Sequence, residues 1–159
     1  MNESLAGSDG WTYHGPSDDL SIAFVKPAYL GVADQIAAAI EASGLRVISG
    51  ELVVLTLEIA QKLYEEHVGN EEKFRWITEL ASSGPIMLWV VQGKNVATRL
   101  KELVGPTDAS VARRDFPNTI RGRFWNPELS KWDNCIHNST PERRLIEGVL
   151  LKPTYFTVG

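Results

Sequence analysis

Four short apolar runs, separated by stretches with helical spacing, constrain the fold of this chain more than any other feature of its sequence. The runs are LSIAFV at 20–25, LRVISGELVVLT at 45–56, IMLWVVQ at 86–92 and NCIH at 134–137. Short runs that are rich in Val and Ile and bounded by Gly or Pro are typical of buried strands. We therefore expect four strands, and we expect Gly50 to mark a bulge or bend in the second one.

The segments between these runs carry apolar residues three and four positions apart, which is the spacing of amphipathic helices. Gly44 and Gly105 each follow such a segment and are expected to end a helix there. Thr56 is expected to cap the helix that follows it. The predicted helices cover residues 32–44, 57–67, 71–82 and 95–105.

Two later stretches have other patterns. Residues 106–131 show no clear periodicity and are rich in Arg, Pro and Asn, so we expect a long loop, which in a compact domain usually has a function. A last helix is expected to run to about Leu150. Its start is capped either by Ser139, paired with Glu142 in a capping box, or by Thr140 ahead of a proline.

The order of elements, βαββαβ with extra helices between, predicts an α/β (α+β) sandwich of the ferredoxin-like kind. Such a fold has a four-stranded antiparallel sheet with helices on one face, to which the extra helices are added. A length of 159 residues suits one domain, and no internal repeat or linker divides the chain. We expect residues 20–159 to form a single domain and residues 1–19, rich in Gly, Ser and Asp, to be a flexible lead-in.

Charge and composition limit the partners. The net charge of −4 argues against nucleic acid. Ten of the 16 Lys and Arg residues lie between Lys94 and Arg144, a distribution that suits a small anionic ligand and that a solvated face would also produce. No apolar run approaches the roughly 20 residues of a membrane span, and the first residues do not resemble a signal peptide. The single cysteine, Cys135, fits a reducing compartment such as the cytoplasm and is expected to be a small buried side chain.

Familiar catalytic motifs are missing from the sequence. It has neither of the glycine-rich phosphate-binding motifs and no serine-hydrolase elbow. Three scattered histidines and one cysteine are too few ligands, in the wrong spacing, for a zinc site. His14 and His67 are expected to be surface residues.

His137 is the candidate for chemistry. It ends the fourth run in the stretch DNCIHNSTPERR, just before the expected start of the last helix, where free backbone N–H groups would seat a phosphate. An imidazole with an ordinary pKa of about 6.5 is half or more unprotonated near pH 7, and it is then a competent nucleophile toward phosphorus. One ring nitrogen must be fixed by a hydrogen bond so that the other presents its lone pair. The alternative is a polar residue in a turn.

Several short motifs resemble those of one known family, and they occur in that family's order between about Leu20 and Leu150. NCIHNS resembles the signature Asn-x-x-His-x-Ser, and FVKP resembles a Lys-Pro step after the first strand. The other matching segments are EASGLRVISGELVVLT, LASSGPIMLWVVQGKNV, LVGPTDA and TIRGRF. Together these segments resemble the nucleoside diphosphate kinases, whose ferredoxin-like fold agrees with the order of elements above.

The resemblance implies that His137 takes the γ-phosphate of a nucleoside triphosphate and passes it to a nucleoside diphosphate in a ping-pong cycle. It implies that Ser139 supports the site and that Glu147 orients the imidazole ring. The implied nucleotide contacts are Lys26, Lys101, Thr107 and Arg121 for the phosphates, Asn134 for the sugar and Phe74 for the base. A Mg²⁺ held mainly by the phosphates, with no dedicated protein ligands, and a homo-oligomer are implied as well.

The sequence departs from the family pattern at several positions. Ala28 stands where the family has Asp or Asn, Val68 stands where a tyrosine is expected, and the aspartate after the motif serine is missing. Lys101 keeps the charge of a phosphate-binding arginine but not its bidentate fork, and Lys73 aligns with the stacking aromatic about as well as Phe74. Two alternatives follow: a domain of this fold that binds nucleotide or a partner protein with little or no turnover, or one that transfers phosphate to a non-nucleotide acceptor.

Overall fold

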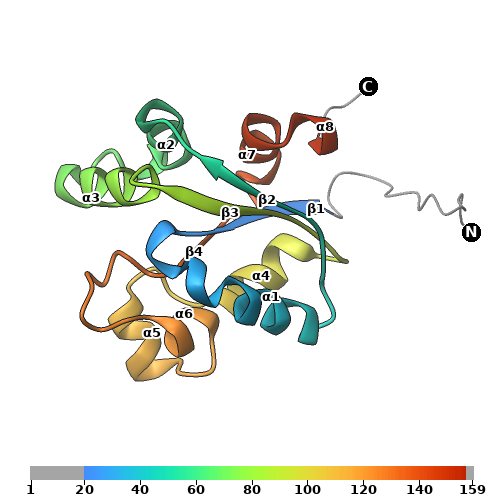
Figure 1. Ribbon diagram of the computed structural model, residues 1–159, viewed down its shortest axis with the longest axis horizontal. Coiled ribbons are helices and arrows are strands. Elements are labelled where there is room, and N and C mark those ends of the chain that lie inside the picture. Colours follow the sequence, from blue (N-terminus) through green and yellow to red (C-terminus); the bar gives the residue numbers. More distant parts are fainter. Residues whose placement is uncertain (1–19, 157–159) are drawn as a thin grey trace, which may run out of the picture.

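The sheet has four antiparallel strands in the order β2-β3-β1-β4. In the computed structural model, which describes residues 20–156, these are β1 (Leu20–Val25), β2 (Arg46–Val54), β3 (Pro85–Gln92) and β4 (Ile136–Asn138) (Figure 1). The central strand β1 pairs with β3 along its whole length and with β4 over three residues. The four expected strands and their βαββαβ order are confirmed. The expected lead-in, residues 1–19, lies outside the described residues.

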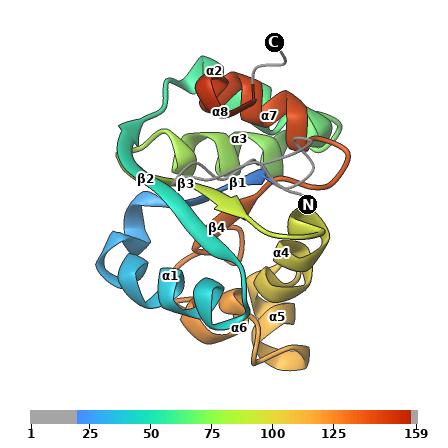
Figure 2. The same ribbon diagram turned by 90° about the vertical axis from the view of Figure 1, so that its right-hand side faces the viewer.

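Helices cover both faces of this sheet (Figures 1 and 2). One face carries α1 (Ala33–Ala42), α4 (Val96–Val104), α5 (Ala109–Asp115) and α6 (Ile120–Phe124). The other face carries α2 (Leu57–Leu63), α3 (Glu71–Ala81), α7 (Arg144–Leu151) and α8 (Pro153–Phe156). Two short 3₁₀ segments are η2 (Pro27–Val32) and η3 (Glu65–His67). The ferredoxin-like helices α1 and α4 thus share one face, and extra helices close the second.

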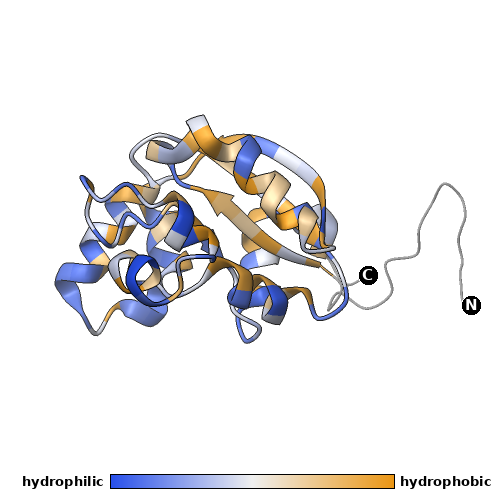
Figure 3. Ribbon diagram, turned by 90° about the horizontal axis from the view of Figure 1, so that it is seen from below, coloured by the Kyte–Doolittle hydropathy of each residue, from blue (hydrophilic) through white to orange (hydrophobic). Residues whose placement is uncertain are grey.

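Strand β1 explains how the sheet can be covered on both sides. All six of its residues are buried and five of them are apolar, which is typical of a strand packed on both faces. Ala23 and Val25 belong to the core beneath α1 and α4, whereas Leu20, Ile22 and Phe24 belong to the core beneath α2 and α3. Figure 3 shows the strands as strongly hydrophobic elements between more polar helices.

Strand β2 is irregular at a different place from the one expected. The register shift lies between Val47 and Ser49, and Gly50 itself pairs with Trp89. A Cβ at Gly50 would come within 3.2 Å of the Trp89 ring. The predicted bulge at Gly50 is wrong, because this glycine makes room for the neighbouring indole and does not bend the strand.

The region 106–131 is not one long loop, so this prediction is also wrong. It contains α5 and α6, and each has its own cap. The Asp108 carboxylate accepts backbone N–H bonds in the first turn of α5, and the Thr119 hydroxyl accepts from Gly122 N–H in α6. Helices of seven and five residues are too short for apolar periodicity to show in the sequence.

Helix α7 begins later than expected, at Arg144, and neither proposed cap is used. A turn at 140–143 precedes the helix, and Ser139 donates its hydroxyl hydrogen to Glu147 instead of capping. The phosphate seat predicted at a helix N-terminus directly after His137 is therefore wrong. Pro141, which follows Thr140, has no backbone N–H to donate, and this allows the turn to form.

Other predicted helix ends are confirmed. The Thr56 hydroxyl accepts a hydrogen bond from Ile59 N–H at the start of α2. Gly44 and Gly105 follow α1 and α4 with φ values of 98° and 94°, which side chains other than glycine rarely adopt. Over residues 20–156, no helix combines the length and the apolar character that a membrane crossing requires.

Candidate active site

Strand β4 holds His137 against the centre of the sheet. His137 pairs with Phe24 across the two strands. The chain enters β4 through Cys135, whose φ of 71° is unusual for a residue other than glycine. The Cys135 side chain is fully buried, as expected, and its carbonyl accepts the backbone N–H of Lys26. This bond joins the end of β1, where Lys26 stands, to the start of β4.

A pocket of about 170 Å³ opens at this end of the sheet. The predicted site residues that line it are Lys26, Lys101, Thr107, Arg121, Asn134 and His137. Ser139 and Glu147 are buried next to His137 and contact each other. Eight of the predicted residues are thus gathered around one pocket, although they come from segments far apart in the sequence.

His137, Ser139 and Glu147 form a hydrogen-bonded triad. His137 Nε2–H donates to Glu147 Oε1 at 2.8 Å, and Ser139 Oγ–H donates to the same oxygen at 2.6 Å. Burial raises the pKa of Glu147, but the nearby His137 and the hydrogen bonds from His137, Ser139 and Arg143 outweigh it and hold the pKa below its ordinary value. An ionised Glu147 fixes Nε2 as the protonated ring nitrogen, which leaves the lone pair on Nδ1.

Two aromatic rings fix the plane of the imidazole. Phe24 stacks on the His137 ring with centroids 4.9 Å apart, and Tyr64 meets it edge-on at 5.1 Å. The Tyr64 hydroxyl is buried and finds no hydrogen-bond partner among residues 20–156. Burial raises the pKa of Tyr64, so the hydroxyl remains a protonated donor beside the pocket.

Lys26 and Asn134 form a buried polar bridge. Lys26 Nζ donates to Asn134 Oδ1 at 2.6 Å and to the Trp132 carbonyl at 3.3 Å. Asn134 Nδ2 in turn donates to the Thr107 carbonyl at 2.6 Å. Burial, and then the positive charge of Arg121, lower the pKa of Lys26 to about 7. A phosphate in the pocket would favour the charged form of this lysine.

Arg121 is the second buried cation of the pocket. Its Nη1 donates to the Gly105 carbonyl at 2.9 Å and its Nη2 to the Ile136 carbonyl at 2.7 Å, so the guanidinium is fixed by backbone. Within the part of the chain that the structure describes, its Nε–H has no acceptor. Burial lowers the pKa of Arg121 to about 10, which still leaves it charged near neutral pH.

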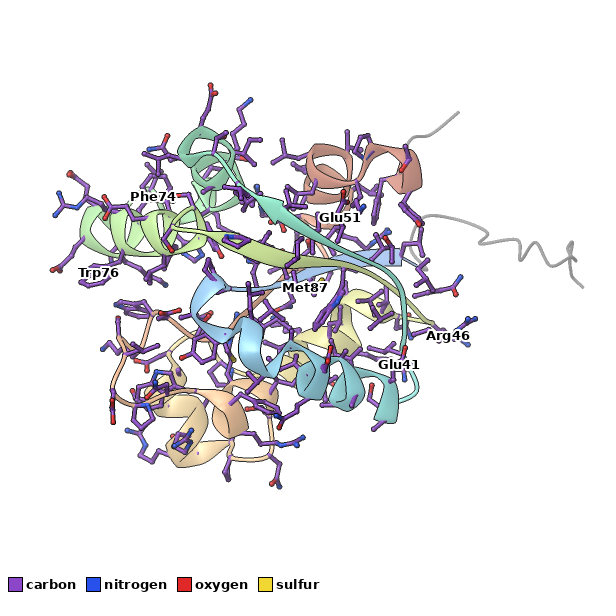
Figure 4. The ribbon with its side chains drawn as sticks, in the orientation of Figure 1. Glu41, Arg46, Glu51, Phe74, Trp76 and Met87 are labelled. Atoms are coloured by element: carbon purple, nitrogen blue, oxygen red, sulfur yellow. The ribbon has the colours of Figure 1, made fainter. Side chains whose placement is uncertain are left out.

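Phe74, the predicted stacking aromatic, is not among the described residues that line the pocket. It lies on α3 and is partly buried against the core on that face (Figure 4). Lys73, the alternative, places its Nζ over the Trp132 ring, 4.7 Å from the ring centroid. The structure therefore gathers the predicted phosphate residues but does not bring the predicted base contact into the same pocket.

The pocket also has walls that the sequence did not indicate. Tyr64, Glu66 and His67 line it from the end of α2 and from η3. His67, expected at the surface, is half-buried and lines the pocket, and this burial is the main reason that its pKa is lowered. The only sequence signal for this wall is that Val68, directly after it, stands where the family has a tyrosine. Arg143, which contacts Glu147, carried no motif at all.

The pocket favours an anionic ligand that the free Nδ1 of His137 can attack. Two buried cations in a low-dielectric setting attract phosphate oxygens more strongly than exposed ones would. No cluster of three or more His, Cys, Asp or Glu residues able to hold a metal ion occurs among the described residues. The side chains themselves can thus bind a phosphate chain and present one nucleophilic nitrogen to it.

Comparison with known proteins agrees with this chemistry. A family model described as "Nucleoside diphosphate kinase" matches residues 19–148. A nucleoside diphosphate kinase of Ignicoccus hospitalis is 35% identical over 114 residues, which cover 71% of this chain and 73% of that protein. The Metallosphaera sedula protein of the same name is 37% identical over 110 residues, 69% of this chain and 74% of that one.

Solved structures lead to the same family. The Aquifex aeolicus nucleoside diphosphate kinase superposes with a TM-score of 0.73 at 29% identity, covering 84% of this chain and 94% of that one. The Halobacterium salinarum enzyme, solved in complex with CDP, gives a TM-score of 0.72 at 28% identity, covering 84% and 87%. From these matches and the geometry of its pocket, the chain belongs to the nucleoside diphosphate kinase family of phosphotransferases.

Proposed function

We propose that this chain transfers the γ-phosphate of a nucleoside triphosphate to a nucleoside diphosphate through a phosphate carried on Nδ1 of His137. The observation that supports this most is the Nε2–H bond to Glu147 in a pocket with two buried cations, Lys26 and Arg121. With Nε2 occupied, Nδ1 is the nitrogen that can attack. The buried carboxylate balances the positive charge that develops on the ring.

The reaction has two matched halves. The Nδ1 lone pair attacks the γ-phosphorus, an N–P bond forms, and the bond from phosphorus to the bridging oxygen breaks, so a nucleoside diphosphate leaves. The ring then holds its proton on Nε2 against Glu147. In the second half a terminal oxygen of another nucleoside diphosphate attacks the same phosphorus, and Nδ1 leaves with its lone pair.

Binding of the phosphate chain follows from the pocket walls. Lys26 contacts the phosphates from within, together with the Arg121 Nε–H, which has no acceptor among residues 20–156, while the exposed Lys101 and Thr107 contact them at the mouth. Asn134 holds Lys26 through Oδ1 and offers the second hydrogen of Nδ2 to a sugar hydroxyl. Positioning and charge neutralisation of this kind are the main demands of phosphoryl transfer.

The base, the cation and the assembly complete the proposal. Phe74 stacks on the base beyond the lined pocket. The family needs a divalent cation, and we propose Mg²⁺, which would be held by phosphate oxygens and water and would neutralise phosphate charge. We further propose a homo-oligomer that works in the cytoplasm on nucleoside tri- and diphosphates.

The test is to incubate the protein with ATP labelled at the γ-phosphate and Mg²⁺, and to ask which residue is labelled. An acid-labile phosphate is expected that is absent from His137→Ala and that moves to added GDP or dTDP. His67→Ala is the matched histidine variant, and it should still take the acid-labile label.

Each outcome decides between functions. Label that persists in His137→Ala would reject His137 as the nucleophile. Label that forms but never moves to any diphosphate would point to a non-nucleotide acceptor. Nucleotide binding without any label would reject the kinase reaction and leave a nucleotide-binding domain.

A further inference from the structure

Arg143 connects the Glu147 carboxylate, which holds His137, to the pocket wall formed by the end of α2 and by η3. Its Nε donates to Glu147 Oε2 at 3.0 Å, and its Nη2 donates to the Lys62 carbonyl at 3.0 Å. Its Nη1 lies 3.1 Å from a carboxylate oxygen of Glu65, and its Nε lies 3.8 Å from one of Glu66. One side chain at the start of α7 thus contacts α2, η3 and the triad.

The bond to Glu147 completes a carboxylate that is almost entirely removed from water. Oxygen Oε1 already accepts from His137 and Ser139, so Arg143 supplies the bond to the other oxygen, Oε2. The Glu147 side chain is 1% exposed and that of Arg143 is 12% exposed. A buried carboxylate with one oxygen unpaired is costly and tends to take up a proton.

This ion pair differs from an ordinary helix-surface pair. Exposed pairs four residues apart contribute little, because both partners remain hydrated. Here the carboxylate is buried and the guanidinium is only 12% exposed, and the pair is continuous with the imidazole that reacts. Arg144, the next residue, donates to the Leu20 carbonyl instead. The two neighbouring arginines therefore make a matched pair of test positions.

We propose that Arg143 is a positioning residue for phosphoryl transfer, which keeps Glu147 ionised and aimed at Nε2 of His137 and ties that carboxylate to the η3 wall of the pocket. This inference rests on the proposed function. The wall matters because η3 carries Glu66 and His67 into the pocket. A shift of η3 on nucleotide binding would reach Glu147 through Arg143.

The groups that face Glu147 come from three places. His137 and Ser139 contact it from β4 and the residue that follows, Tyr64 faces it from the end of α2, and Arg143 faces it from the start of α7. Glu65 and Glu66 face Arg143 from η3 and also form ion pairs with its guanidinium group. Of these, Arg143 is the positively charged group that bonds directly to Oε2.

The experiment compares Arg143→Gln, Arg143→Lys and Arg144→Gln with the wild type. The rate of His137 labelling by ATP is measured in single turnovers between pH 5 and pH 9. For Arg143→Gln we expect the rate to fall roughly 10- to 100-fold with little change in the ATP concentration for half-saturation. The fall should be largest at low pH. Without Arg143, the Glu147 carboxylate takes up its proton at a higher pH than in the wild type. Lysine should restore part of the rate, and Arg144→Gln should match the wild type.

A second readout separates this inference from the proposed function. Nitrogen-15 NMR of labelled histidine, without nucleotide, reports which ring nitrogen of His137 carries the proton. We expect Nε2–H in the wild type, in Arg144→Gln and largely in Arg143→Lys, and a mixture in Arg143→Gln. A wild type that takes no label would reject the proposed function, while the NMR spectra would still test Arg143.

Two results would overturn the role of Arg143. One is an Arg143→Gln protein whose pH profile and maximal rate match the wild type. The other is an unchanged His137 tautomer in both Arg143 variants. If Arg143→Gln does not fold, the labelling rate of Arg143→Lys keeps the test decisive. Lysine retains the charge but not the planar fork, so an Arg143→Lys protein with the wild-type rate and pH profile would also overturn the role. Loss of stability with unchanged kinetics and tautomer would leave Arg143 a purely structural residue.

Discussion

Replacing Lys26 by methionine should stabilise the protein near pH 6 while it removes phosphoryl transfer. Lys26 is 2% exposed, and burial, followed by Arg121, lowers its pKa from 10.5 to about 7. At pH 6 the ammonium group is charged in both the folded and the unfolded chain. The folded state then carries the full cost of burying that charge.

The size of the effect follows from the two pKa values. Between pH 7 and 10.5 the unfolded chain binds more protons at Lys26 than the folded one, so the free energy of unfolding rises with pH across this range. At about 1.4 kcal/mol per pKa unit, the total rise is roughly 5 kcal/mol. Methionine avoids that cost at pH 6. It also leaves Asn134 Oδ1 and the Trp132 carbonyl without their donor, at roughly 1–2 kcal/mol each, so a net gain of about 1–3 kcal/mol remains.

The assay is urea unfolding of the wild type and Lys26→Met at several pH values from 6 to 10. Taking the difference between the two proteins cancels the other lysines and tyrosines. The advantage of the methionine variant should be largest at pH 6 and should shrink or reverse as the pH approaches 10. A methionine variant that is less stable at pH 6, with a difference that does not change with pH, would refute the idea that Lys26 is held as a costly buried cation for phosphate binding.

Three further substitutions have defined outcomes. Glu147→Gln removes the charge that balances the imidazole, and it should slow His137 labelling roughly 10- to 100-fold, as measured in single turnovers; an unchanged rate would contradict the triad. Tyr64→Phe removes a buried hydroxyl that has no partner among the described residues, so thermal unfolding should show a gain of about 1 kcal/mol; a loss of stability would mean that the hydroxyl is hydrogen-bonded in the folded protein. Gly148→Ala would place a Cβ 2.3 Å from the Phe156 ring, so denaturant unfolding should show a loss of roughly 1–3 kcal/mol; full stability would mean that α8 moves freely away from α7.

The strands could be predicted because their signal is local. β1, β2 and β3 each coincide with an uninterrupted or alternating apolar run, and Gly105 ends α4 as expected. The short helices α5 and α6 could not be predicted, since seven and five residues are stabilised by their caps and by packing more than by a periodic pattern. The role of Gly50 could not be predicted either, because a glycine is needed there to leave room for the Trp89 ring on the neighbouring strand.

The residues that form the site divide in the same way. Lys26, Arg121, Asn134 and His137 stand in short motifs, and the fold gathers them in one pocket. Arg143 stands in no motif, because its importance depends on the Glu147 oxygen that it meets across the α7 turn.

The amino-acid sequence by itself determined the order of strands and main helices, the family, and the candidate nucleophile, since each of these depends on residue types at fixed spacing along the chain. Only the tertiary structure decided which ring nitrogen of His137 is free, how far Lys26 is removed from water, and which side chains form the far wall of the pocket. Those properties depend on burial and on contacts between side chains that lie apart in the chain, from 10 residues for His137 and Glu147 to 108 residues for Lys26 and Asn134, and no local pattern encodes them.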